Sequence, residues 1–209
     1  MTLVKLCGLR NRADVETVNL LLPDFAGFVF ARGSPRYVEP RAAKDLVHGL
    51  DPGVTPVGVF LDAPPSYIEA CCRISGVRTV QVHGEFDDRY VKQVRELTGL
   101  PVIQAFKVAS SEDVRRAVSS TADVILLDNG YGGTGRPFDR SLLEGVDRDY
   151  VLAGGLTPDN VKNTIESVHP YAVDVSTGIE TNGLKDPAKM AAFMDAVHEA
   201  DFREHKVRS

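Results

Sequence analysis

The chain has 209 residues, a formal net charge of −5, 43% hydrophobic residues and 25% charged residues. This length and composition are typical of a folded protein with one sizeable core and exclude a disordered chain. The negative balance provides no global basic field, so we expect neither nucleic acid nor a membrane surface as a partner, and any anion site must be built locally.

The three cysteines, Cys7, Cys71 and Cys72, lack the even, spaced arrangement of a secreted disulfide framework. We expect Cys71 and Cys72 to be packing residues. The five histidines are scattered without zinc-ligand spacing, so the sequence predicts no metal site. No apolar run approaches the length of a membrane span, and the cytoplasm is the expected location.

Short apolar runs that are typical of buried strands alternate with helix-length segments along the whole chain. The expected strands cover residues 4–7, 26–30, 56–60, 79–82, 101–106, 123–127, 150–153 and 172–175. The expected helices cover residues 13–22, 40–50, 65–75, 87–98, a stretch from 111, 140–144, a stretch capped by 157–159, and 187–200. A glycine-rich loop at 129–135 follows the sixth strand, and residues 202–209 are expected to form a frayed tail.

These eight strand–helix units run from end to end without a linker or a break in composition, which predicts a single domain over residues 1–209. Strict alternation predicts a parallel sheet with right-handed crossovers. Eight units in about 200 residues favour a closed barrel over an open doubly wound sheet. The predicted fold class is therefore α/β, a single (β/α)8 TIM barrel.

Polar and small residues gather where these strands end. The carboxyl ends of the expected strands hold Cys7, His83, Asp128, Gly154, Gly155, Ser176, Thr177 and Gly178. A barrel of this kind carries its chemistry at that rim. Because side chains alternate along a strand, Lys5 and Cys7 share the inward face.

Small residues follow the seventh and eighth strands, as Gly154-Gly155 and Ser176-Thr177-Gly178. One such small-residue segment, taken alone, is typical of a tight turn. Two of them on neighbouring barrel strands favour a phosphate site, because small residues let backbone N–H groups surround an anion.

Cys7 and Asp128 are candidates for a base and an acid. A buried cysteine taken alone more often packs than reacts. As a base it must lose its proton, and as an acid Asp128 needs a pKa raised towards neutrality. Two roles are open for Lys5: it lowers the pKa of the Cys7 thiol, or it pairs with the inward Asp174 of the eighth strand, the pairing we predict.

Two further rim residues are candidates for binding a ligand. Arg36 follows Ser34-Pro35 in the loop after the second strand, and the spacing predicts a clamp for a carboxylate. His83 ends the fourth strand, where it either contacts a substrate or only completes the rim.

Several segments together resemble one known family. They are Lys5-Leu-Cys-Gly-Leu, Gly27-Phe-Val-Phe, Ser34-Pro-Arg-Tyr-Val, Val57-Gly-Val-Phe, Val80-Gln-Val-His-Gly, Gly132-Gly-Thr-Gly, Leu152-Ala-Gly-Gly-Leu and Val173-Asp-Val-Ser-Thr-Gly-Ile-Glu. Their order and spacing along the whole chain resemble the phosphoribosylanthranilate isomerases of tryptophan biosynthesis. Departures are small: Ala-Arg-Gly precedes Ser34, and Arg136-Pro137 follows Gly135.

The resemblance implies an aldose–ketose isomerase that carries out the Amadori rearrangement of N-(5-phosphoribosyl)anthranilate to 1-(2-carboxyphenylamino)-1-deoxyribulose 5-phosphate. It implies Asp128 as general acid at the ribose ring oxygen and Cys7 as general base at C2. Arg36 would hold the anthranilate carboxylate, and the loops at Gly154-Gly155 and Ser176-Thr177-Gly178 the phosphate. A small-molecule substrate is implied, and no cofactor.

Three alternatives remain beside this interpretation. Indole-glycerol-phosphate synthase would rely on a lysine acid, and the histidine-pathway sugar isomerases carry an aspartate where Cys7 stands. A non-catalytic barrel that binds a phosphate ligand would need neither Cys7 nor Asp128. The lack of an obvious apolar helix face favours a monomer.

Overall fold

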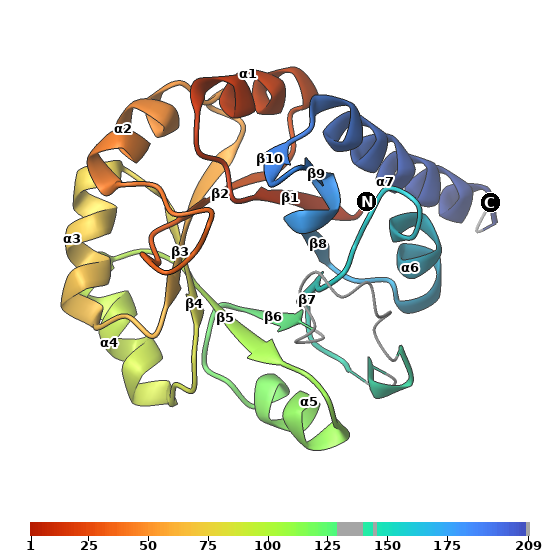
Figure 1. Cartoon of the computed structure of the whole chain (residues 1–209). Coiled ribbons are helices and arrows are strands. Elements are labelled where there is room, and N and C mark those ends of the chain that lie inside the picture. Colours follow the sequence, from red (N-terminus) through yellow and green to blue (C-terminus); the bar gives the residue numbers. More distant parts are fainter. Residues whose placement is uncertain (129–139, 144–145, 208–209) are drawn as a thin grey trace.

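Eight parallel strands form a closed barrel in chain order, and helices surround it (Figure 1). The computed structural model describes residues 1–128, 140–143 and 146–207, so the predicted glycine-rich loop at 129–135 lies outside the described residues. The strands are β1 (Leu3–Cys7), β2 (Phe25–Val29), β3 (Thr55–Leu61), β4 (Thr79–His83), β5 (Val102–Lys107), β6 (Val124–Asp128), β7 (Tyr150–Ala153) and β8 (Ala172–Val175). The predicted (β/α)8 barrel is confirmed.

The outer ring contains α1 (Arg12–Leu21), α2 (Pro40–His48), α3 (Pro65–Ser75), α4 (Asp88–Thr98), α5 (Ser111–Val118), α6 (Val161–Val168) and α7 (Pro187–Val207). Local sequence sets several of their starts. Pro40 occupies the first turn of α2, where its missing N–H costs nothing. Ser110 and Asp113 form a reciprocal capping box at the start of α5.

Several elements differ from the sequence prediction. The sixth unit carries a short 3-10 helix, η1 (Arg140–Leu143), and residues 158–160 form a turn before α6, whose N-cap is Asn160. After β8 the chain forms a second 3-10 turn, η2 (Thr177–Ile179), and then a small antiparallel ribbon of β9 (Glu180–Thr181) and β10 (Leu184–Lys185). Strands of two residues carry too little pattern to be predicted from sequence.

The last helix continues past residue 200, so residues 202–207 are helical where the sequence predicts a frayed tail. Its inner face is fully buried at Met190, Phe193, Val197 and Ala200. The carboxylate of Asp201 then accepts hydrogen bonds from the backbone N–H of Thr2 at 2.8 Å and from its hydroxyl at 3.0 Å. This anchor to the start of the chain holds the helix where an unsupported terminus would fray.

The alternation of side chains along the strands divides the core into two layers. Val4, Leu6, Phe28, Val80 and Val173 point outward and pack under the helices. Val57, Val59, Leu126, Val151 and Ala172 point inward and fill the barrel. The interior also holds polar side chains that are almost fully buried, among them Lys5, Gln81 and Asp174.

The interior pair of Lys5 and Asp174 lies where β1 and β8 close the barrel, because these two residues face each other in the strand register. Lys5 Nζ lies 2.9 Å from Asp174 Oδ2, and both side chains are buried. The predicted pair is confirmed. Burial lowers the pKa of Lys5, but the charge of Asp174 and then that of Cys7 outweigh it, so the pKa is raised and Lys5 is charged.

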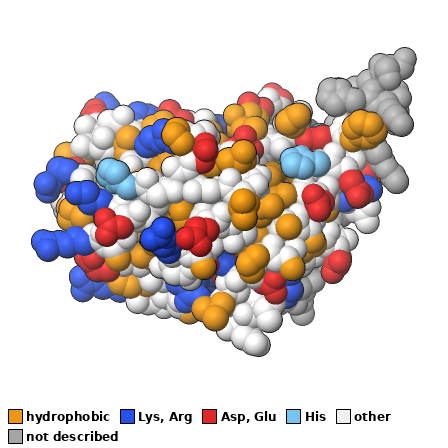
Figure 2. All heavy atoms as spheres, turned by 90° about the horizontal axis from the view of Figure 1, so that it is seen from above, with side chains coloured by type: hydrophobic (Ala, Val, Ile, Leu, Met, Phe, Trp, Pro, Cys, Tyr) orange, Lys and Arg blue, Asp and Glu red, His pale blue; other side chains and the backbone are white. Residues whose placement is uncertain are grey.

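The exterior is charged and mixed. Figure 2 shows one face of the molecule, on which Lys and Arg side chains are interspersed with Asp and Glu. Within the described part of the chain, none of the helices is both long and apolar enough to span a bilayer.

We expect Lys5→Met to lower the free energy of unfolding by about 3–5 kcal/mol, because it leaves the carboxylate of Asp174 buried without its partner. Urea denaturation followed by circular dichroism measures this change. Arg12→Met, which removes an exposed ion pair to Glu16 on α1, is the matched control and should change the stability little. Equal effects of the two variants would contradict a structural role for the buried pair.

Candidate functional site

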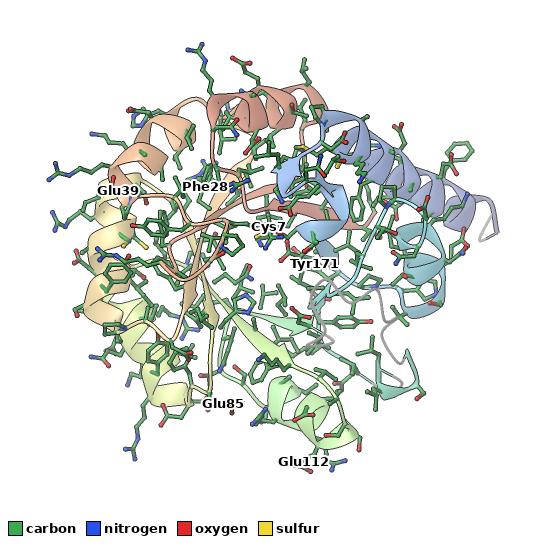
Figure 3. All side chains as sticks on the ribbon, viewed as in Figure 1. Cys7, Phe28, Glu39, Glu85, Glu112 and Tyr171 are labelled. Carbon is green, nitrogen blue, oxygen red and sulfur yellow. The ribbon has the colours of Figure 1, made fainter. Side chains whose placement is uncertain are left out.

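A cavity of about 460 Å³ opens at the carboxyl ends of the strands. Its lining includes every residue that the sequence predicts for the site: Cys7, Arg36, His83, Asp128, Gly154, Gly155, Ser176, Thr177 and Gly178. Figure 3 shows Cys7 inside the ring of strands, whereas Glu39, Glu85 and Glu112 lie at its periphery. The barrel thus brings together residues from six of its strands or the loops that follow them.

A second cavity of about 610 Å³ lies beside the first, over the ends of β3 to β6. The two share His83 and Asp128 in their linings. The larger one lacks Cys7, Arg36 and the small-residue loops after β7 and β8. The smaller cavity therefore holds the combination of groups that suits chemistry on an anion.

Cys7 ends β1 with its thiol buried against β2. A Cβ atom added to Gly27 would lie 2.7 Å from the sulfur, so this neighbour must be glycine for the thiol to occupy its place. Burial raises the pKa of the thiol, and the positive charge of Lys5 opposes the rise without cancelling it. Of the two roles left open by the sequence, Lys5 therefore takes the pairing with Asp174, and its charge only limits the rise in the pKa of the Cys7 thiol.

His83 ends β4 and lies between the two cavities. Burial, reinforced by the positive charge of Lys5, lowers its pKa to about 4, so the ring is neutral at physiological pH. Its Nε2 lies 2.7 Å from the amide nitrogen of Gln81. With Gln81 as the donor, Nε2 accepts and Nδ1 carries the ring proton, a tautomer assigned from this hydrogen bond.

The loops after β7 and β8 touch each other directly. A Cβ atom on Gly178 would lie 1.9 Å from the carbonyl oxygen of Leu156, so only glycine fits where the backbones meet. Gly154 and Gly155 adopt φ angles of 91° and 67°, a region that favours glycine. Asn160 fixes this turn, since its amide donates to the carbonyl of Gly155 at 2.9 Å.

Asp174 also lines the cavity. Its Oδ2 is bound by Lys5, whereas its buried Oδ1 has no hydrogen-bond partner among the described residues. Buried carboxylate oxygens are nearly always paired in folded proteins. This atom is therefore an acceptor available to a ligand hydroxyl or amine.

Arg36 lies on the rim as the sequence predicts, but much of its guanidinium is already bound. Its Nε and Nη2 each donate to the carboxylate of Glu180 at 2.7 Å, and Nη2 also donates to the hydroxyl of Thr177 at 3.2 Å. The hydrogen bond to Glu180 raises the pKa of Arg36. Nη1 is the guanidinium nitrogen without a hydrogen-bond partner among the described residues.

Glu180 and Lys185, which lie in the ribbon of β9 and β10, have no role predicted from the sequence. Lys185 Nζ donates to Glu180 at 2.8 Å and to the carbonyl of Ser176 at 2.9 Å. Although burial raises the pKa of Glu180, its hydrogen bonds from Arg36 and Lys185 lower it to about 2. Glu180 is the last residue of the family-like segment Val173-Asp-Val-Ser-Thr-Gly-Ile-Glu. The sequence resemblance therefore included Glu180 but did not indicate that it pairs with Arg36.

The arrangement offers a candidate acid and a candidate base in one cavity, a cationic side chain on one rim, and two contacting small-residue loops. Within the described residues, no three His, Cys, Asp or Glu side chains are grouped so that they could hold a metal ion. The site suits a small ligand that carries a phosphate and a second negative group.

Known proteins are similar to this chain over almost its whole length. The family model described as N-(5'-phosphoribosyl)anthranilate (PRA) isomerase matches residues 4–196. The N-(5'-phosphoribosyl)anthranilate isomerase of Acetivibrio thermocellus is 39% identical, over 96% of this chain and 98% of the relative. That of Desulforudis audaxviator is 41% identical, over 96% of this chain and 100% of the relative.

Solved structures show the same likeness. The phosphoribosylanthranilate isomerase of Thermotoga maritima superposes with a TM-score of 0.88 at 36% identity, covering 95% of this chain and 100% of the other. A structure of such an isomerase in complex with reduced 1-(o-carboxyphenylamino)-1-deoxyribulose 5-phosphate superposes with a TM-score of 0.86 at 34% identity, with the same coverage. This chain belongs to the N-(5'-phosphoribosyl)anthranilate isomerase family.

Proposed function

We propose that this chain, as a phosphoribosylanthranilate isomerase of tryptophan biosynthesis, rearranges N-(5'-phosphoribosyl)anthranilate with Asp128 as general acid and Cys7 as general base. The observation that carries this assignment of roles is the single cavity lined by both groups together with Arg36 and the small-residue loops. An aldose–ketose rearrangement needs one proton donor and one proton acceptor, placed on either side of a held sugar phosphate.

In the first step Asp128 gives its proton to the ribose ring oxygen, and the bond from that oxygen to C1 breaks. The nitrogen lone pair forms the C1–N double bond of a protonated Schiff base. Cys7, as thiolate, then removes the proton from C2. The electron pair of the broken C2–H bond forms a C1–C2 double bond, and the electron pair of the C1–N double bond returns to nitrogen, which gives an enol–amine. The enol–amine then tautomerises: C1 gains a proton and the hydroxyl on C2 loses one, both exchanged with solvent, which gives the ketone of the product, and solvent likewise returns a proton to Asp128 and takes one from Cys7.

Charge and hydrogen bonding support one orientation of the substrate. The phosphate lies against the loops at Gly154-Gly155 and Ser176-Thr177-Gly178, and the anthranilate carboxylate lies against Arg36. Asp174 Oδ1, which lacks a partner among the described residues, accepts a hydrogen bond from a ribose hydroxyl. His83 is neutral, so it acts as a hydrogen-bonding group and adds no charge to the cavity.

The alternatives from the sequence fit the cavity less well. Indole-glycerol-phosphate synthase relies on a lysine acid, and none of the described residues that line this cavity is a lysine. The histidine-pathway sugar isomerases carry an aspartate in the place of Cys7. A binding protein without turnover would need neither the acid nor the base.

Three statements from the sequence stay predictions: a single domain over residues 1–209, a monomeric state and a cytoplasmic location. One solved relative is described as a set of monomers generated from the dimeric isomerase of Thermotoga maritima, so both states are accessible to similar chains. Light scattering of the purified protein decides the oligomeric state.

The roles of Cys7 and Asp128 are tested by Cys7→Ser and Asp128→Asn. We expect each variant to lower kcat by about 10²–10⁴-fold, because each removes a proton-transfer group while keeping a similar shape. The decay of anthranilate fluorescence with phosphoribosylanthranilate as substrate measures turnover. Cys72→Ser on α3 and the exposed Asp45→Asn on α2 are the matched controls and should retain wild-type rates.

Unimpaired turnover in either site variant would contradict the role assigned to that residue. A wild-type protein that binds the substrate without converting it would favour the non-catalytic alternative.

The pH dependence of kcat/KM reports the state of Cys7 in the free enzyme. A base works when it is deprotonated, so kcat/KM should rise as the pH rises through the pKa of the thiol. Because burial raises that pKa, we expect the rise to continue above the ordinary thiol range, and we expect no separate step from His83 between about pH 5 and 8. A rate profile that is already flat at neutral pH would contradict this expectation.

A further inference from the structure

Three charged side chains form a chain of ion pairs at the edge of the cavity. The Arg36–Glu180–Lys185 chain runs from the rim into the protein, with Arg36 partly exposed and the side chains of Glu180 and Lys185 only 6% and 1% exposed. Arg36 lines the cavity, whereas Glu180 and Lys185 are absent from its described lining. The two inner members therefore lie behind the group that faces a ligand.

The contact between Arg36 and Glu180 fixes the orientation of the Arg36 guanidinium as well as its position. Two parallel hydrogen bonds of 2.7 Å join Nε and Nη2 to the two oxygens of one carboxylate. This bidentate geometry holds the plane of the guanidinium, which a single bond would leave free to rotate. The remaining edge, which includes Nη1, keeps its donors for another anion.

Glu180 is itself held from the other side. Lys185 donates to the oxygen that Arg36 Nε also contacts, at 2.8 Å, and to the carbonyl of Ser176 in the loop after β8. With two positive groups and one negative group, the chain carries one net positive charge. A lone glutamate beside the cavity would repel an anionic substrate, whereas this chain attracts it.

The Arg36 side chain and the loop that carries it are also held by neighbouring residues. A Cβ atom on Gly8 would lie 2.5 Å from Arg36 Cδ, so the side chain crosses directly over the end of β1. Arg10 donates to the carbonyl of Pro35 at 2.7 Å and to that of Gly183 at 2.6 Å. This one side chain joins the loop that carries Arg36 to the ribbon that carries Glu180 and Lys185.

We infer that Glu180 and Lys185 are positioning residues that hold the guanidinium of Arg36 with its unbound edge ready for the carboxylate of the aromatic substrate. This inference rests on the proposed function, because it takes that carboxylate as the ligand of Arg36. Neither residue touches the reacting atoms, so their effect should fall on substrate binding and leave the chemical step almost unchanged.

The alternative to positioning is that Glu180 competes with the substrate carboxylate for Arg36. If Glu180 competed with the substrate for Arg36, its removal would free the clamp and tighten binding. Holding and competing therefore predict opposite changes in KM, and one variant separates them.

The test is Glu180→Gln, which keeps the shape of the side chain and removes its charge. We expect KM for phosphoribosylanthranilate to rise about tenfold with kcat within about twofold of wild type, as for a lost hydrogen bond between charged groups that serves binding alone. Glu69→Gln, which removes the charge from an exposed ion pair with Arg73 on α3, is the matched control and should leave both constants unchanged.

A double-mutant cycle with Arg36→Ala separates positioning from a general loss of structure. If Glu180 acts through Arg36, then Glu180→Gln should add no more than about twofold to KM in the Arg36→Ala background. Independent, multiplying effects would overturn the inference. So would a lower KM in Glu180→Gln, an unchanged KM, or a fall in kcat alone.

Circular dichroism and thermal unfolding confirm that each variant is folded. If Glu180→Gln does not fold, Lys185→Met takes its place: it should raise KM with kcat retained, and an unchanged KM overturns the inference.

Wild-type turnover decides the proposed function separately. Without turnover, the same cycle is measured on the dissociation constant of reduced 1-(o-carboxyphenylamino)-1-deoxyribulose 5-phosphate, and failure of the wild type to bind this compound overturns the positioning role as well.

Discussion

The buried pair of Lys5 and Asp174 is the interaction on which the site depends. It lies where the first strand meets the last, so the two charges neutralise each other only when the barrel is closed. Taking two charges out of water is costly, and the cost is offset by their mutual attraction in the interior. One buried oxygen of Asp174, a residue that lines the cavity, is left without a protein partner among the described residues.

The electrostatics of Cys7 follow from the same arrangement. Burial favours the neutral thiol, and the nearby positive charges of Lys5 and Lys185 favour the thiolate. On balance the pKa of the thiol remains raised. His83 is kept neutral by the same burial and the same positive charge.

The end of β8 connects the two regions proposed to bind anions. Gly178 touches the backbone of Leu156 in the loop after β7, and the hydroxyl oxygen of Thr177 accepts a hydrogen bond from Arg36. A few residues further on, the ribbon supplies Glu180 and Lys185. The small-residue loops and the arginine on the rim are therefore parts of one contiguous structure. Because this structure is closely packed, a displacement of either part would displace the other.

The order of strands and helices, the barrel and the candidate residues on its rim could be predicted from the sequence, because apolar periodicity and strand-end positions are local patterns. The inward alternation of β1 and β8 was enough to pair Lys5 with Asp174. Tertiary contacts alone explain three other features: the hydrogen bonds between Arg36 and Glu180, the ribbon that holds Lys185, and the anchored end of α7. Arg36 and Glu180 lie 144 positions apart in the chain, and no local pattern specifies which buried carboxylate an arginine will meet once the barrel closes.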